Sequence, residues 1–150
     1  MSNLIANLLA ETKVNPALLE IELTESTFID QTNTIITDIH ALKQLGITLA
    51  IDDFGTYYAS LSYLKRFVFN NIKIDRTFVR DINKSKEDRS IVLAIIAMAN
   101  HLGLNVTAEG IETKEQLQFF RDHFVFGVQG YYLSYPLDKE ACTQLLMKNT

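Results

Sequence analysis

The chain has 150 residues, a formal charge of −4 at pH 7 and a hydrophobic fraction of 47%. This composition excludes a disordered or collagen-like polymer, and the mild acidic balance argues against a partner such as a DNA or RNA polymer, which demands a basic surface. It is compatible with one hydrophobic core and with a small anionic ligand held by a metal.

Short apolar or alternating segments take turns with helical patterns along the chain. Strands are expected at 18–24, 47–51, 71–75, 104–108, 124–129 and 131–134, and helices at 3–12, 32–45, 59–66, 86–102, 113–121 and 137–147. Gly46 and Gly103 stand where a C′ glycine ends a helix. The alternation predicts an α/β fold with a parallel sheet of about six strands. An open doubly wound sheet and part of a (β/α)₈ barrel are both compatible with it.

Several simpler features narrow the class of protein. The chain has one cysteine, Cys142, which we expect to be a small core residue because no histidine lies near it in the sequence. No apolar run reaches the length of a membrane span, and the N-terminus has no basic segment of the kind that begins a signal peptide. We therefore expect a soluble, cytoplasmic protein.

Polar side chains gather where the expected strands end. Glu22 and Glu25 close the first strand, and the ends of the next four carry the remaining members: Asp52, Asp53, Lys73, Asp75, Glu109 and Gln129. A single acid after a strand is commonly a helix cap. Five strands in succession with such a residue instead predict a functional rim, because all parallel strands of a barrel end on the same side.

The chemistry of this rim favours a hard divalent cation. Its ligand atoms are carboxylate oxygens, which Mg²⁺ and Mn²⁺ prefer, and converging carboxylates would repel one another without a cation. The adjacent pair Asp52 and Asp53 suits a site for two ions. Lys73 is expected either to neutralise a phosphate or to form a salt bridge with a rim acid.

These residues occur in motifs that resemble the EAL domain, the bacterial phosphodiesterase of cyclic di-GMP. The pieces are Glu-Leu-Thr-Glu-Ser at 22–26, Asp-Asp-Phe-Gly-Thr at 52–56, Lys-Ile-Asp-Arg-Thr-Phe-Val at 73–79, Ala-Glu-Gly-Ile-Glu-Thr at 108–113 and Gln-Gly-Tyr at 129–131, with Pro136 beyond. They run in family order over nearly the whole chain. The resemblance implies a partial TIM-type (β/α)₈ barrel that acts in bacterial signal transduction.

The resemblance also implies a role for each rim residue. The metal ligands would be Glu22, Asp52, Asp53 and Glu109, which together hold Mg²⁺ or Mn²⁺, two ions in the complete domain. Lys73 would hold the attacked phosphate or the water, and Glu109 or Asp53 would be the base. Gln129 would contact the substrate, and Glu25 would anchor the loop after Asp53. The implied reaction is in-line attack by metal-activated water on cyclic di-GMP, giving linear pGpG.

Three features depart from the family pattern. The Glu-Ala-Leu motif and the family's asparagine ligand are absent, and Tyr57 and Ala59 stand where the family has glycine and serine. We therefore expect residues 1–150 to be one truncated EAL domain without its first two barrel strands. Such a chain would have weak or no turnover, and self-association or an N-terminal part would cover its exposed strand edges.

Two other classes of function are compatible with the sequence. The first is a non-catalytic module, which is either a sensor of cyclic di-GMP or a protein-interaction module of a signalling protein. The second is a different Mg²⁺-dependent barrel enzyme, whose motifs would match those of the EAL domain by chance.

Overall fold

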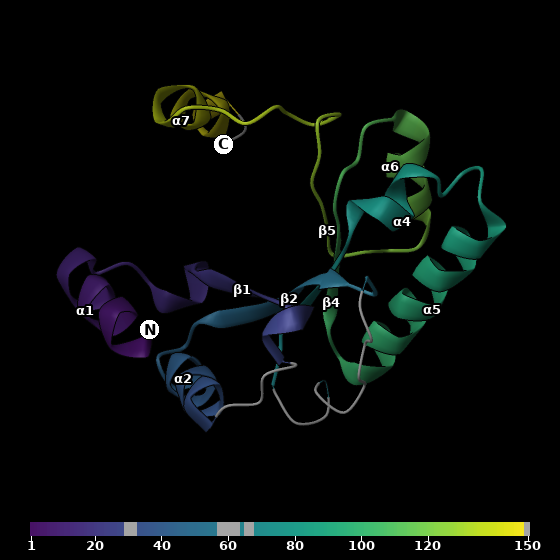
Figure 1. Cartoon of the computed structure of the whole chain (residues 1–150). Helices are drawn as coiled ribbons and strands as arrows, with labels where there is room; N and C mark the ends of the chain where they lie inside the picture. Colours follow the sequence, from purple (N-terminus) through teal and green to yellow (C-terminus); the bar gives the residue numbers. More distant parts are fainter. Residues whose placement is uncertain (29–32, 57–63, 65–67, 149–150) are drawn as a thin grey trace.

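The computed structural model of the chain describes residues 1–28, 33–56, 64 and 68–148. A five-stranded parallel sheet forms its centre, with helices before, between and after the strands (Figure 1). The strands are β1 (Glu20–Thr24), β2 (Thr48–Phe54), β3 (Asn71–Ile74), β4 (Asn105–Ala108) and β5 (Gly127–Val128). Their order across the sheet equals their order in the chain. This order lacks the reversal of a doubly wound sheet and is that of consecutive strands in a (β/α)₈ barrel.

Six α-helices and two short 3₁₀ helices accompany the strands in the described part. The α-helices are α1 (Ser2–Thr12), α2 (Asn33–Gln44), α4 (Arg76–Arg80), α5 (Lys86–Leu102), α6 (Lys114–Asp122) and α7 (Lys139–Lys148). The 3₁₀ helices are η1 (Pro16–Leu18) and η2 (Glu25–Phe28). Helix α7 stands away from the sheet at the end of an extended segment (Figure 1) and buries none of its residues.

The hydrophobic core lies between one face of the sheet and the helices. Side chains of a strand alternate between its two faces, so Ile51, Ile72 and Val106 share the face that packs against the helices. The residues next to them in each strand point to the other face, which is where Lys73 and its neighbours lie. The fold therefore separates an apolar, helix-covered face from a polar one.

The ends of the helices explain why several predicted boundaries are close to the observed ones. Helix α5 begins after Ser85, whose side chain accepts from the Asp88 N–H, and ends at Gly103 with φ 70°, as its sequence predicts. Helix α6 has a capping box, in which Thr113 and Gln116 each accept from the other's backbone N–H.

The strand predicted at 131–134 is wrong. The N–H groups of Leu133 and Ser134 both donate to the carbonyl of Gly130, which closes a turn and leaves no backbone free to extend the sheet. The described residues therefore form five strands, not about six. The strand expected at 124–129 shortens to β5, because only Gly127 and Val128 pair with β4.

Two further corrections concern helices. Residues 76–80 form the short helix α4, which the sequence pattern did not predict, and Asp75 caps it by accepting from the Thr77 N–H. Cys142 is exposed on α7 and is not a core residue. The helix predicted at 59–66 lies, apart from Leu64, outside the described residues, as do Tyr57 and Ala59.

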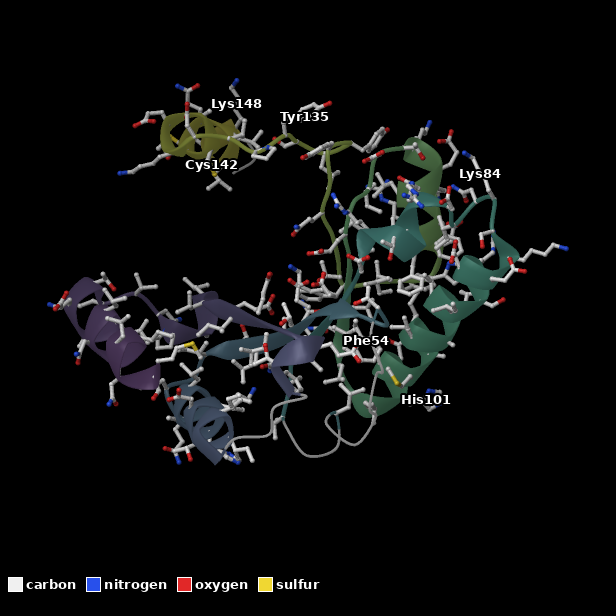
Figure 2. The ribbon with its side chains drawn as sticks, in the orientation of Figure 1. Phe54, Lys84, His101, Tyr135, Cys142 and Lys148 are labelled. Carbon is white, nitrogen blue, oxygen red and sulfur yellow. The ribbon has the colours of Figure 1, made fainter. Side chains whose placement is uncertain are left out.

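Helix α5 buries one stripe of side chains, whereas α7, which carries Cys142 and Lys148 in Figure 2, buries none. In the part of the chain that the structure describes, no helix combines the length and the apolar character needed to cross a membrane.

One buried side chain joins α4 to α6. The carbonyl oxygen of the Gln116 side chain accepts from the N–H groups of Glu112 and Thr113 at 2.7 and 3.0 Å. Its amide nitrogen donates to the carbonyls of Val79 and Arg80, both at 3.2 Å. Gln116 is 4% exposed, so each of these backbone groups would lose its partner in a dry environment without it.

We expect Gln116→Leu to lower the free energy of unfolding by about 2–3 kcal/mol, because it keeps the volume and leaves buried backbone groups unpaired. Urea denaturation monitored by circular dichroism measures this. The control is Gln118→Leu on the exposed side of the same helix, where the change should stay within about 0.5 kcal/mol. Equal effects of the two variants would contradict the joining role of Gln116.

Candidate functional site

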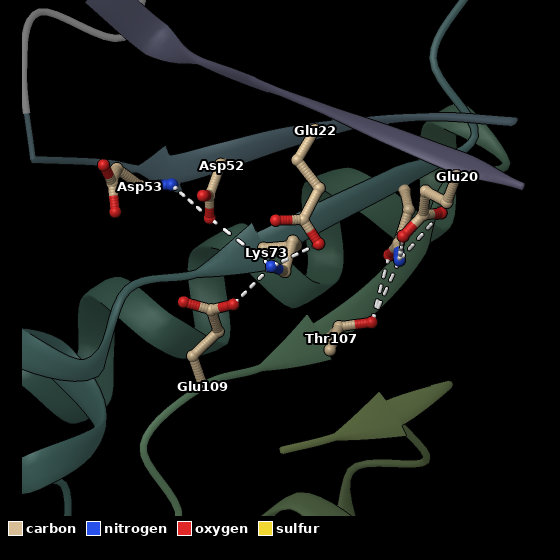
Figure 3. Close-up of polar contacts among 8 residues, drawn as sticks. Glu20, Glu22, Asp52, Asp53, Lys73, Thr107 and Glu109 are labelled. Atoms are coloured by element: carbon tan, nitrogen blue, oxygen red, sulfur yellow. Dashed lines mark hydrogen bonds and ion pairs between the residues drawn. The ribbon is translucent and has the colours of Figure 1, made fainter. Parts of the chain in front are cut away.

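Lys73 of β3 is the centre of the polar cluster. Its ammonium nitrogen lies 2.6 Å from Glu22 Oε1 and 2.5 Å from Glu109 Oε1, and 3.7 Å from Asp52 Oδ1 (Figure 3). Glu22 comes from β1, Asp52 from β2 and Glu109 from the residue after β4. Four neighbouring parallel strands thus bring these side chains together near their carboxyl ends, as the sequence predicts.

The second aspartate of the pair on β2 is placed by an irregularity of the strand. The register between β2 and β3 shifts between Ile51 and Phe54, and Asp53 has φ 54°, in the left-handed region. Its N–H donates to Asp52 Oδ1 at 3.0 Å. In a regular strand two adjacent side chains would point to opposite faces. Because of the register shift, the regular alternation does not hold at Asp53. Its carboxyl lies close enough to Asp52 and Asp75 for their charges to raise its pKa.

The pKa values of the side chains in this cluster depend on two effects, their burial and the charges of their neighbours. Burial alone would lower the pKa of Lys73, but the hydrogen bonds that its ammonium donates to Glu109 and Glu22 raise the pKa above the ordinary lysine value. Burial raises the pKa of Glu109 despite its contact with Lys73. Burial, followed by the charges of Asp52 and Asp75, raises the pKa of Asp53. Lys73 is therefore a cation, and two carboxyls hold protons more readily than usual.

The donor set fits a hard divalent cation by its chemistry. Several carboxylate oxygens converge on one positively charged point, and carboxylate oxygens are the ligands that Mg²⁺ and Mn²⁺ prefer. Within the described ranges, no three His, Cys, Asp or Glu side chains are arranged so that they could hold a metal ion by themselves. The positive charge that the carboxylates meet here is the Lys73 ammonium.

Gln129 and Glu25 lie outside this direct cluster. Gln129 follows β5, and it lines a cavity of about 510 Å³ together with Glu109 and Arg76. Glu25 begins η2 and is 4% exposed; its Oε2 accepts from the Gly55 N–H at 3.3 Å. Its Oε1 has no hydrogen-bond partner among the described residues. The structure thus places Gln129 beside the rim and Glu25 against the start of the segment after Asp53.

Two residues near the rim stand in the motifs at 73–79 and 108–113, but their sequence positions alone predict no role for them. Arg76 is the first residue of α4 and lines the cavity, while Gly110 follows Glu109 with φ 72°. A Cβ atom on Gly110 would lie 2.5 Å from the Cβ of Arg76. The glycine is required here, because it lets the backbone after Glu109 pass close to α4. Only the three-dimensional structure reveals this contact.

The comparisons with known proteins agree with this geometry. The family model of the EAL domain matches residues 1–136. This chain belongs to the EAL domain family. Among curated proteins it is similar to the cyclic di-GMP phosphodiesterase NbdA of Pseudomonas aeruginosa, with 42% identity over 142 residues. That match covers 95% of this chain and 18% of NbdA, so the chain spans about a fifth of the length of such relatives.

Solved structures show the same relation. The crystal structure of the EAL domain of Mycobacterium smegmatis DcpA matches with a TM-score of 0.91 and 35% identity, over 98% of this chain and 66% of that one. The manganese and cyclic di-GMP complex of Klebsiella pneumoniae BlrP1 matches with a TM-score of 0.80 and 34% identity, over 87% of this chain and 33% of that one. In BlrP1 this fold is therefore seen in a complex with manganese and cyclic di-GMP.

Removing the central cation should destabilise the protein. We expect Lys73→Met to lower the free energy of unfolding at pH 7 by about 2–3 kcal/mol, because it leaves three neighbouring carboxylates uncompensated. The raised pKa of Lys73 means that its contribution is complete at pH 7 and is lost only in strongly alkaline solution. Denaturation at pH 7 and pH 4 measures the effect, which should shrink at pH 4 as the carboxyls protonate. Lys86→Met, at an exposed position, is the control; a loss that does not depend on pH would contradict this account.

The ionised carboxylate of Asp53 should lower the free energy of unfolding of the chain. Because its pKa is raised in the folded state, its contribution to the free energy of unfolding falls as pH rises through the carboxyl range. We expect Asp53→Asn to stabilise the chain at pH 7 by about 0.5 kcal/mol, since it removes like-charge repulsion and asparagine tolerates the left-handed backbone. Thermal denaturation against the exposed control Asp122→Asn measures this. A destabilised Asp53→Asn variant would refute the repulsion.

Proposed function

We propose that this chain is the part of a cyclic di-GMP phosphodiesterase domain that carries most of its metal and phosphate chemistry. The observation that carries the proposal is the convergence of Glu22, Asp52 and Glu109 on Lys73 at the carboxyl ends of neighbouring parallel strands. The names of the relatives support the substrate, since NbdA is a cyclic di-GMP phosphodiesterase and BlrP1 forms a complex with manganese and cyclic di-GMP.

In this proposal four carboxylates hold the metal: Glu22, Asp52, Asp53 and Glu109. Mg²⁺ or Mn²⁺, bound as two ions in the complete domain, would lower the pKa of a bound water and offset negative charge on the phosphate. The carboxylates would position these ions through oxygen ligands, the type that both metals prefer. The bulge at Asp53 supports this assignment, because strained backbone of this kind concentrates at functional sites.

The protein's own groups would then handle the phosphate and the proton. Lys73, a buried cation with a raised pKa, neutralises a non-bridging oxygen of the attacked phosphate as a point charge. Glu109 or Asp53 accepts the proton of the attacking water. Both have pKa values raised above those of ordinary carboxyls, which brings them closer to the pH at which a general base works best.

The neighbouring cavity would hold one end of the nucleotide. Its volume of about 510 Å³ falls within the range of small-molecule sites, and it opens beside Glu109. Gln129 would donate a polar contact there, and Arg76 brings a positive charge. Glu25, through its hydrogen bond from Gly55, would anchor the segment after Asp53.

The isolated chain is expected to turn over weakly or not at all. Its 150 residues contain neither the family's Glu-Ala-Leu motif nor the family's asparagine ligand. The outer strands β1 and β5 each pair on one side only in the described part. A further protein segment or a second copy of the chain would cover these edges, because an unpaired strand edge readily accepts another strand.

The alternative is a non-catalytic sensor of cyclic di-GMP. It uses the same cluster and cavity to bind the nucleotide without cleaving it, and passes the signal to a partner protein. This alternative is favoured by the described residues, among which no three acid, histidine or cysteine side chains could hold a metal ion by themselves.

The assay for this function combines binding and turnover. Wild-type chain is incubated with cyclic di-GMP and Mn²⁺, binding is measured by calorimetry, and pGpG is measured by chromatography. We expect metal-dependent binding that falls at least about 10-fold in Glu22→Gln and Asp52→Asn and is unchanged in Glu11→Gln, an exposed acid of α1. Binding with pGpG formation supports the enzyme, and binding without it supports the sensor. No metal-dependent binding of cyclic di-GMP would contradict both.

A further inference from the structure

A second polar layer lies below the charged cluster on the same face of the sheet. Asn71 of β3 donates from its amide nitrogen to Thr107 Oγ1 at 3.0 Å and to the two carboxylate oxygens of Glu20 at 3.4 and 3.5 Å (Figure 3). The hydroxyl of Thr107 also donates to Asn71 Oδ1 at 3.4 Å. None of these three residues belongs to the site described above.

This layer repeats the connectivity of the charged cluster. Glu20, Asn71 and Thr107 each stand two residues before a member of that cluster, namely before Glu22, Lys73 and Glu109. In both layers the residue on β3 contacts one residue from β1 and one from the β4 segment. Because side chains two apart on a strand share a face, the lower layer lies directly beneath the upper one.

The small residues around the lower layer leave space for these contacts. Ala50 of β2 lies in register between Glu22 and Asn71, so only a methyl group stands where Glu20 reaches over β2. On the other side, a Cβ atom on Gly127 would lie 3.1 Å from Thr107 Oγ1. A larger side chain at either position would displace one partner of Asn71, which is itself only 5% exposed.

The edge strand β1 is the strand that we expect this layer to stabilise most. Glu22 is the most exposed of the three carboxylates around Lys73, with a side chain 44% exposed, and β1 pairs with β2 alone in the described part. Exposed ion pairs contribute little to holding a strand in place. Glu20 is itself exposed, but its partner Asn71 is only 5% exposed, so the lower layer links the edge strand to a buried side chain two residues before Glu22.

We infer that Glu20, Asn71 and Thr107 are positioning residues, which hold β1 and β4 so that Glu22 and Glu109 meet at Lys73. The inference rests on the proposed function only where it concerns metal. The network acts through the strands and touches neither Lys73 nor its partners. Mutation of a residue that supports metal ligands in this way commonly lowers metal affinity by a factor of about 10 to 100.

The experiment uses Asn71→Leu, which removes both contacts, and Thr107→Val, which removes one and keeps the shape. Amide hydrogen exchange of the 150-residue chain is followed by NMR without metal. In both variants we expect exchange at Leu23 and Thr24 of β1 to accelerate at least about 10-fold more than exchange in α5. Thr107→Ser keeps the hydroxyl and should restore the wild-type pattern.

The control is Thr143→Val. The Thr143 hydroxyl donates to the Lys139 carbonyl within α7, away from the sheet, so the change removes a hydroxyl with one hydrogen bond and leaves the network intact. Exchange in β1 that accelerates equally in Thr143→Val, or only in proportion to the whole molecule, would overturn the inference. If Asn71→Leu does not fold, Thr107→Val and its serine rescue decide.

A second readout connects the network to the site. The Mn²⁺ dissociation constant, measured by electron paramagnetic resonance, should rise about 10-fold in Thr107→Val and stay at the wild-type value in Thr107→Ser and Thr143→Val. An unchanged constant in Thr107→Val overturns the positioning role. If the wild-type chain binds no Mn²⁺, the proposed function fails, and the exchange experiment still decides whether the network positions β1.

Discussion

The buried ammonium of Lys73 is the constraint on which the polar face of this sheet depends. Three carboxylates from three different strands approach it, and without a positive charge at this point their mutual repulsion would oppose the pairing of those strands. The same arrangement makes the site chemically useful. A group of carboxylate oxygens held close together against their repulsion binds a further cation more readily than separate acids on a surface would, and the Lys73 ammonium is the group here that attracts a phosphate.

The parallel sheet is what brings these charges together. Each strand supplies its side chain at the same end, and the crossover helices keep the other face dry. The bulge at Asp53 adds a second carboxylate on β2 that a regular strand would direct away. Below this rim, the uncharged Asn71 takes the place of Lys73 and contacts the Glu20 carboxylate and the Thr107 hydroxyl, which links the edge strand to the interior. Fold and site are therefore built from the same cross-strand contacts.

Much of this could be predicted from the sequence, for reasons that particular residues make clear. Ser85 and Gly103 cap α5 at both ends, so its bounds follow from local chemistry. Glu22, Asp52 and Glu109 each lie within two residues of the carboxyl end of a strand, so their meeting follows from the parallel direction of the strands. What was missed depends on contacts that local patterns do not encode. The turn after Gly130 closes through its own carbonyl, the shift at Asp53 depends on the register with β3, and the partners of Asn71 are 51 and 36 residues away. Asp75 was interpreted as a rim acid, but it also caps α4.

The most direct measurement of the central claim is a crystal structure of the chain grown with Mn²⁺, with data collected at the manganese absorption edge. The account predicts an anomalous peak from a manganese ion that is coordinated by oxygens of Glu22 and Asp52, with Glu109 and Lys73 at the same rim. A well-ordered structure that has no such peak there, and in which these side chains lie apart, would contradict it.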